Sequence, residues 1–539
     1  MDDSVTPASP SLTITGRGGP WTMVTGSRQS RSEPAASLTA GGNLTPPQPG
    51  ATPQIALRKP YVAMRRFERQ AGQMSVDDGE DPTAPGGGVS GRLPAPRGWL
   101  TRGGWPAFVG STTVLVLASV AADGIAFGAK EACRAGAWNV GVEQYQAHCY
   151  TDIYPLYYTE GLWNGQAPYL THHVEYPVII GAVMQGAAWV VKSMPNAYSR
   201  GLQFFDVTVG VLALFLVIGV LATAYCAGPG RRWTALLVAF SPALILSAFI
   251  NWDLIAMGFM MLALASWTAR RLVLAGVFLG LAVATKFYPI VVLWPLFLLC
   301  LRAGRLRAFA VTTCSAAAAW LVVNLPIVIA APQGWATFYT FSSHRGADWG
   351  GIWYFFQYVH WPVVDTSAVG RLNLMSVAAF GVGCLAIGLL ALAAPRRPRL
   401  AQLVFLTTAA FLLCNKVWSP QYVVWLVPLV VLARPRLPAY LVWQAAEVGY
   451  FYAIWSYLIT VVAGLREPGA ISATLYFTAV LARFGSVLLL CALVVRECLR
   501  PDLDVVRSVG VDDPAGGVLA DAPDRLALQG GLRRLAAPA

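Results

Sequence analysis

Side chains that can take up or stabilise charge are scarce in this sequence, and they gather in short stretches between long apolar runs. The stretch CYTDIYPLYYTEGL, residues 149–162, holds Asp152 and Glu160 among four tyrosines. A carboxylate within hydrogen-bond reach of an attacking hydroxyl can take its proton, which is general-base catalysis. Asp152 and Glu160 are therefore candidate bases. The alternative for Asp152 is a solvated loop acid or a helix cap.

Basic side chains that could bind a phosphate lie in other polar stretches. ATKFYP (284–289) contains Lys286, FSSHRGADWGG (341–351) contains His344 and Arg345, and NKVWSPQY (415–422) contains Lys416. Lys and Arg stabilise the negative charge that develops on a departing phosphate. Lys286, Arg345 and Lys416 are thus candidate phosphate ligands, and His344 could hydrogen-bond a phosphate or an acceptor. The alternative is that the basic side chains snorkel to lipid headgroups.

The remaining polar residues of these stretches are expected to position a substrate. They include the acids of EYP (175–177) and NWD (251–253), and the full set is Glu160, Glu175, Asp253, Gln421 and Tyr422. His172 and His173 are adjacent but have no spaced third ligand, so no metal site is predicted. The sequence has no glycine-rich phosphate loop followed by Lys and Ser or Thr, so no nucleotide is implied.

The composition predicts an all-α polytopic membrane protein, because 56% of the residues are hydrophobic and only 12% are charged. Between residues 105 and 496, apolar runs of about 17–25 residues recur, long enough to cross a hydrocarbon core of ~30 Å. The net charge of +12 comes mostly from arginine clusters between these runs, so a nucleic-acid partner is not expected. No early stretch resembles a cleavable signal, and residues 105–127 are the first anchor.

The arginine clusters predict the topology, because short basic loops face the cytoplasm. About 12 crossings then place both ends of the chain inside. Residues 1–103, rich in Pro, Ser, Thr and Gly, form a disordered cytoplasmic tail, and residues 497–539 form a C-terminal cytoplasmic tail. Within the membrane domain, 104–496, the large outer loops are 128–173 and 331–373. Residues 174–192 form an interfacial or re-entrant helix, with a thirteenth span as the alternative.

Two further pairs of residues follow from this topology. Cys133 and Cys149 are the two cysteines placed outside, where an oxidising environment would tolerate a disulfide between them. Glu447 and Arg483 each lie about ten residues into one of the last two spans, so both are ~15 Å deep. Charges inside a bilayer are costly enough to need partners, and we therefore predict an ion pair between these two helices.

The order of the motifs resembles glycosyltransferase family 87, a family of the polytopic GT-C superfamily. The motifs are an acid in the first outer loop, then EYP, NWD, ATKFYP, a basic aromatic outer loop and WSPQY (418–422), and the resemblance covers about residues 105–496. It implies a GT-C-like helical bundle in which Asp152, as the first-loop aspartate, is the general base. Glu160 remains the rival.

The resemblance also implies the reaction. A polyprenyl-phosphate sugar is the donor substrate and no separate cofactor is needed, while a lipid or glycan is the acceptor. The enzyme is expected to be an inverting mannosyltransferase of the plasma membrane with its active site on the outer face, and an arabinofuranosyltransferase is the alternative. A transporter or flippase of lipid-linked sugars would also need polar groups in a membrane cavity. The gathering of polar groups on one face favours the enzyme.

Overall fold

Six long helices run through the protein, whose computed structural model describes residues 104–362, 368–507, 512–520 and 522–527. The predicted N-terminal tail, residues 1–103, lies outside the described residues, as does 528–539. Each long helix is apolar enough and long enough to cross a membrane. They are α2 (Gly104–Gly128), α7 (Ala197–Ala227), α13 (Leu306–Ala330), α16 (Val369–Ala393), α19 (Leu437–Ala463) and α20 (Ala473–Leu499).

Shorter apolar helices lie between the long ones. They are α6 (Val178–Val191), α10 (Asp253–Thr268), α11 (Leu272–Thr285), η5 (Tyr288–Val292) with α12 (Leu293–Arg302), α17 (Leu400–Cys414), and η6 (Pro420–Tyr422) with α18 (Val423–Ala433). Between α7 and α10 the chain is divided into η4 (Arg232–Ala235), α8 (Leu236–Ala239) and α9 (Pro242–Ser247). The described part of the chain contains no strand, so the predicted all-α class is confirmed. The number of about 12 crossings stays a prediction.

The polar stretches singled out from the sequence lie where the shorter helices end. NWD ends at Asp253, the first residue of α10, Lys286 follows α11, and residues 415–419 separate α17 from η6. Helix α10 has 16 residues and α7 has 31, and at 1.5 Å per residue they are roughly 24 and 46 Å long. The short helices therefore end well inside the length of the long ones, and the first loop packs against their ends.

Helix α6 lies within the segment predicted to be interfacial or re-entrant. Its 14 residues span roughly 21 Å, which is less than the ~30 Å of a hydrocarbon core. The Tyr169 hydroxyl donates to the backbone oxygens of Tyr176 and Pro177, directly before the helix. A Cβ at Gly181 would lie 2.4 Å from the Tyr169 ring, so only glycine permits this packing. The short length supports the interfacial interpretation, which stays a prediction.

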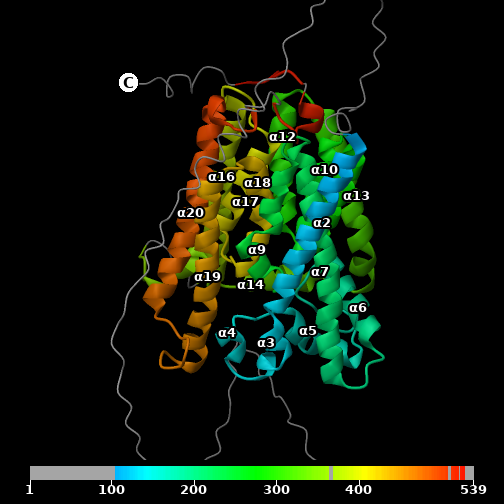
Figure 1. Ribbon diagram of the computed structural model, residues 1–539, viewed down its shortest axis with the longest axis vertical. Helices are drawn as coiled ribbons and strands as arrows, with labels where there is room; N and C mark the ends of the chain where they lie inside the picture. Colours follow the sequence, from blue (N-terminus) through cyan, green and yellow to red (C-terminus); the bar gives the residue numbers. More distant parts are fainter. Residues whose placement is uncertain (1–103, 363–367, 508–511, 521, 528–539) are drawn as a thin grey trace, which may run out of the picture. The chain divides into compact units, whose positions relative to one another are not determined.

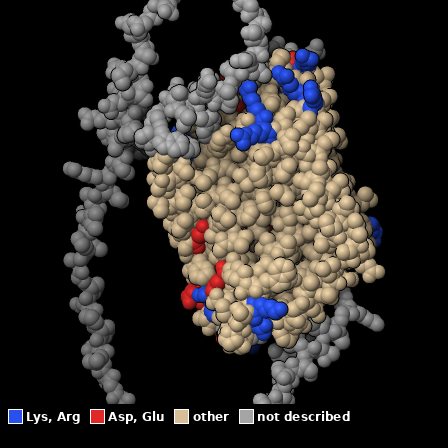
Figure 2. Space-filling model, turned by 90° about the vertical axis from the view of Figure 1, so that its right-hand side faces the viewer, with Lys and Arg blue, Asp and Glu red and all other residues tan. Residues whose placement is uncertain are grey.

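The charged residues are concentrated at the two ends of the bundle, with a broad belt of uncharged surface between them (Figure 2). Figure 1 shows the C-terminal segment in red at one end and α3 (Glu131–Arg134), α4 (Glu143–Gln146) and α5 (Ile153–Thr159) at the other. We call these the arginine end and the loop end. Six arginines from four clusters contact residues after position 496 and so share the arginine end: Arg231, Arg302, Arg397, Arg399, Arg434 and Arg436.

The chain after α20 packs on the arginine end. The buried guanidinium of Arg399 contacts both carboxylate oxygens of Asp504, at 2.7 and 3.2 Å, and that of Arg302 lies 2.7 Å from Asp524. The Trp267 indole donates to the Gly516 oxygen at 3.0 Å. Asp504 and Asp524 thus neutralise two buried arginines, as buried charges require.

The predicted ion pair between the last two long helices is confirmed. Arg483 Nε lies 2.8 Å from Glu447 Oε2, and both side chains are buried. Trp443, one turn before Glu447, donates to the other carboxylate oxygen at 3.0 Å. The pair joins α19 to α20 inside the bundle, where an unpaired charge would be strongly destabilising.

Candidate active site

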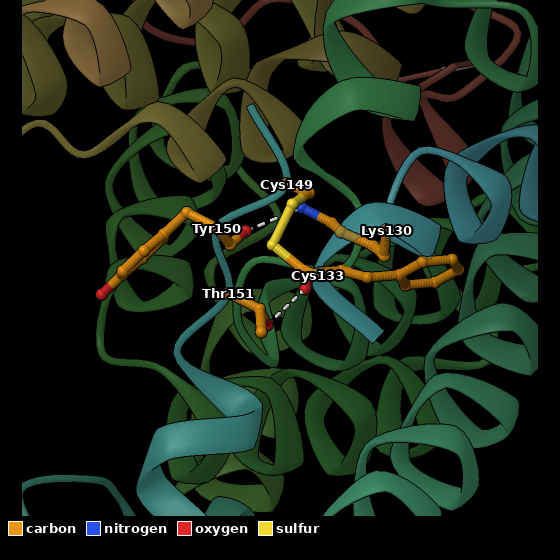
Figure 3. Close-up of a disulfide and its surroundings, with 6 residues drawn as sticks. Lys130, Cys133, Cys149, Tyr150 and Thr151 are labelled. Carbon is orange, nitrogen blue, oxygen red and sulfur yellow. Dashed lines mark hydrogen bonds between the residues drawn. A yellow bond between two sulfur atoms is a disulfide. The ribbon is translucent and has the colours of Figure 1, made fainter. Parts of the chain in front are cut away.

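Asp152 lies at the loop end, between the first loop and α5. Its backbone nitrogen donates to the Ile250 oxygen at 2.8 Å, and the neighbouring Thr151 hydroxyl donates to the Phe249 oxygen at 2.7 Å (Figure 3). The half-buried carboxylate accepts hydrogen bonds from the Tyr150 hydroxyl at 2.7 Å and from Asn251 Nδ2 at 2.8 Å. It makes no capping bond to α5, so its two oxygens are oriented by the side chains on either side.

Asn251 connects Asp152 to Lys286. The Lys286 ammonium donates to Asn251 Oδ1 at 3.1 Å and lies 3.6 Å from Asp253 Oδ2. It also lies 5.3 Å from the centre of the Tyr176 ring, a cation–π distance. This arrangement follows from local structure, because α11 ends at Thr285 and Lys286 is extended. Lys286 therefore belongs to the same hydrogen-bonded network as Asp152.

Three stacked aromatic rings form one side of this network. The rings of Tyr288 and Tyr422 each stack on Trp425 with 3.9 Å between ring centroids. The Trp425 indole donates to Asp253 Oδ1 at 2.8 Å, which fixes the carboxylate beside Lys286. Gln421 is buried next to this stack, and its Oε1 has no hydrogen-bond partner among the described residues. Gln421 and Tyr422, which the sequence assigned to substrate positioning, thus lie close to this network.

Arg345 and Lys416 form a second group of cations. Arg345 Nη2 lies 3.0 Å from Asp348 Oδ1, and the Asp348 backbone nitrogen donates to the Lys416 oxygen at 2.8 Å. The buried Lys416 ammonium donates to the Ser343 oxygen and to Asn373 Oδ1, and no carboxylate lies within ion-pair distance of it in the described ranges. Burial, with a contribution from Arg345, lowers the pKa of Lys416. This group carries positive charge without a full set of anions, as an anion-binding site does.

His344 lies beside the second group without joining it. It is the last residue of α14 (Pro332–His344), and its Nδ1 lies 2.7 Å from the Thr340 oxygen of the same helix. The side chain is exposed. Its predicted role in binding phosphate or acceptor stays a prediction.

Glu175 is close enough to both groups to interact with their charges. Its half-buried carboxylate makes no hydrogen bond or ion pair to any residue that the structure describes. Burial raises the pKa of Glu175, the positive charges of Arg345 and Lys286 oppose that rise, and the charge of Asp152 adds to it. A carboxylate that interacts with the charges of both cation groups but is bound to neither can still accept a hydrogen bond from a substrate hydroxyl.

Glu160, the rival base, is held elsewhere. Its Oε2 lies 3.1 Å from His172 Nε2, and only 7% of the residue is exposed. Burial, reinforced by Glu175, raises the pKa of Glu160 to about 7. Burial and the adjacent His173 lower the pKa of His172. Both shifts favour the neutral forms, so near neutral pH Glu160 is divided between its protonated and ionised forms, and it remains the rival base.

Sequence reasoning gave no orienting role to three residues around Asp152. Tyr150 and Asn251 lie in polar stretches singled out from the sequence, close to Asp152 and Asp253 in the chain. This proximity to acids could have indicated their role. Lys130 carried no signal. It is 2% exposed, and its ammonium donates to the Tyr150 oxygen at 2.7 Å (Figure 3). Burial lowers the pKa of Lys130 to about 7, an effect that Asp152 opposes.

The disulfide that the outer loop was expected to tolerate is present. Cys133 and Cys149 are bridged and buried, and the bridge lies beside Lys130 and Tyr150 (Figure 3). It closes the loop between α2 and Asp152 and so restricts the residues that orient the Asp152 carboxylate.

Removal of this bridge should loosen the loop. A Cys133→Ser, Cys149→Ser variant loses a cross-link over 16 residues, worth about 3 kcal/mol. We expect hydrogen exchange of residues 129–150 to rise in the variant, and in the wild type when a reductant is added. Reductant should leave the variant unchanged. Equal exchange in both proteins would contradict a role for the bridge in ordering this loop.

The comparison with protein families agrees with this architecture. The model of glycosyltransferase family 87 matches residues 176–420. Asp253, Lys286, Arg345 and Lys416 fall inside the match, whereas Asp152 precedes it. No curated protein matches the chain. The match confirms the resemblance seen in the motifs: residues 176–420, which include α6, α10–α14, α16 and α17, are similar to glycosyltransferase family 87.

Proposed function

We propose that the protein transfers a sugar, most readily mannose, from a polyprenyl-phosphate donor to a hydroxyl of a lipid or glycan acceptor. The reaction takes place at the outer face of the plasma membrane. The proposal rests on one observation: two different sets of functional side chains lie at the loop end. Asp152 lies in a network with Asn251 and Lys286, and Arg345 and Lys416 form a cation group beside it.

In this proposal Asp152 takes the proton of the acceptor hydroxyl as the hydroxyl attacks the anomeric carbon. The bond from that carbon to the phosphate oxygen breaks, and polyprenyl phosphate leaves. Attack from the side opposite the phosphate inverts the anomeric configuration. Arg345 and Lys416 stabilise the charge that grows on the phosphate. Lys286, close to Asp253 and Asn251, either reaches the same phosphate or keeps the base network in place, while Glu175, Gln421 and Tyr422 bind sugar hydroxyls.

A transfer assay with purified protein in detergent tests the proposal. Labelled polyprenyl-phosphate mannose and polyprenyl-phosphate arabinofuranose are each offered with a lipid extract as acceptor. Label should move from the mannose donor to the acceptor in the absence of any closed compartment. Transfer from the arabinofuranose donor alone would show that the sugar is arabinofuranose and would leave the proposed mechanism unchanged. No transfer in detergent, with donor movement across vesicles that contain the protein, would establish a carrier instead.

Labelling of intact cells tests the side on which the site lies. A cysteine at Arg397, in the arginine end, should be unreachable by an impermeant thiol reagent. A cysteine at Gly469 should be labelled, because Gln146 of the first loop contacts the neighbouring residues Glu467 and Pro468 at the loop end. The cysteine-substituted proteins are compared before and after permeabilisation. The reverse pattern would place the site inside the cell.

A further inference from the structure

Arg483 has contacts beyond its ion pair. Its guanidinium donates to the Trp418 oxygen at 2.9 Å and to the Ser419 oxygen at 3.2 Å. The guanidinium carbon lies 4.3 Å from the ring centres of both Trp418 and Tyr450. An ion pair that only joined α19 to α20 would need none of these contacts. The planar fork of arginine can serve Glu447 and two carbonyls at once.

The two carbonyls belong to the irregular segment between α17 and η6. Residues 415–419 lie outside the helices, so their backbone oxygens need other donors. Arg483 donates to the Trp418 oxygen, and it shares the Ser419 oxygen with the Tyr422 nitrogen, which lies at 3.2 Å. Lys416 lies two residues before Trp418, and η6 with Gln421 and Tyr422 begins directly after Ser419. Arg483 therefore holds the backbone that carries Lys416 on one side and Gln421 on the other.

The same segment holds the loop that carries Arg345. The Ser419 hydroxyl donates to Asp348 Oδ2 at 3.3 Å, and Asp348 binds Arg345 through its other oxygen. A Cβ at Gly350 would lie 2.2 Å from the Trp418 oxygen and 2.3 Å from the Tyr450 hydroxyl, so this loop packs directly on the segment. A shift of Ser419 would move the partner of Arg345 as well as Lys416.

We propose that Arg483 is a positioning residue for the donor phosphate. By holding the carbonyls of Trp418 and Ser419, it sets the distance between Lys416 and Arg345. This inference rests on the proposed function, because it assigns the phosphate of the donor to those two cations. Arg483 itself touches neither donor nor acceptor, and it acts through the segment 416–422.

The test is Arg483→Lys, which keeps the charge for Glu447 and removes the fork that serves both carbonyls. Arg302→Lys is the matched control. Arg302 is also buried, pairs with Asp524 and donates to the Ala391 oxygen at 2.8 Å, but it lies at the arginine end. We expect Arg483→Lys to weaken the binding of polyprenyl phosphate, and to raise the donor KM, by about tenfold, the size of one lost charge-assisted hydrogen bond. The kcat should fall as well, because the same cations stabilise the charge that grows on the departing phosphate, whereas the acceptor KM should change little.

The probe for binding is polyprenyl phosphate without a sugar, titrated into protein in detergent and followed by tryptophan fluorescence. Arg302→Lys should bind it like the wild type. Equal affinity of Arg483→Lys and wild type, or an equal loss in both variants, would overturn the inference and leave the proposed function intact. If the wild type binds polyprenyl phosphate without transferring sugar, the proposed function fails. The difference in affinity between the wild type and Arg483→Lys still decides the role of Arg483. A wild type that does not bind the probe overturns the inference.

Discussion

Replacement of Asp152 by Asn should lower the rate of sugar transfer by roughly 10² to 10⁴-fold, equivalent to about 3–5 kcal/mol of barrier. Asn keeps the size of the side chain and can still accept a hydrogen bond from Tyr150 or from Asn251, so the local structure should survive. It cannot take the acceptor proton. The loss should therefore appear in kcat, while donor binding is kept.

Steady-state transfer and binding of polyprenyl phosphate, measured on one purified preparation, check this expectation. Arg345→Ala gives the opposite pattern as a reference, because a phosphate ligand acts in the ground state as well as in the transition state, so donor binding weakens too. Glu160→Gln is the direct rival. If Asp152→Asn turns over normally and Glu160→Gln does not, the base is Glu160. If both variants still transfer sugar, neither acid is the base and another group takes the acceptor proton.

The common location of the polar motifs could be predicted from the sequence. The apolar runs are long enough to span a membrane and are separated by arginine clusters, so successive turns lie on alternate sides of the membrane. This topology placed NWD, Lys286, Arg345 and Lys416 on the same side. The structure brings these residues together around Asp152 and Glu175. Spacing along the chain was enough for this result because a membrane restricts where turns can lie.

The partners within the site could not be predicted in the same way. Lys286, Arg345 and Lys416 were equivalent candidates for a phosphate, yet Lys286 contacts Asn251 and Asp253 while Arg345 and Lys416 lie in the other group. Which cation meets which acid depends on where each helix ends. Apolar segments such as residues 236–247 look alike in sequence whether they form one helix or the two pieces α8 and α9. The role of Lys130 could not be predicted either, because Lys130 contacts the Tyr150 backbone oxygen only once the loop has folded.

The membrane-buried ion pair is the second feature with a large expected effect. Arg483→Ala leaves the Glu447 carboxylate buried with one donor, from Trp443, and Glu447→Ala leaves the Arg483 guanidinium buried without an anion. Breaking a buried pair by removing one partner costs about 3–5 kcal/mol. Each single variant should therefore lower the folded yield and the midpoint of thermal unfolding in detergent sharply.

The double variant should be less damaged than either single variant, because no uncompensated charge remains once both partners are removed. In a double-mutant cycle the two single losses should exceed the double loss by at least ~1 kcal/mol, beyond the few tenths seen between independent sites. The Trp418 and Ser419 carbonyls lose the hydrogen bonds from Arg483 in both Arg483→Ala and the double variant, so that cost cancels between those two proteins. Additive losses would mean that Glu447 and Arg483 are each stabilised by other partners, with Trp443 and the two carbonyls as the alternatives that the structure offers.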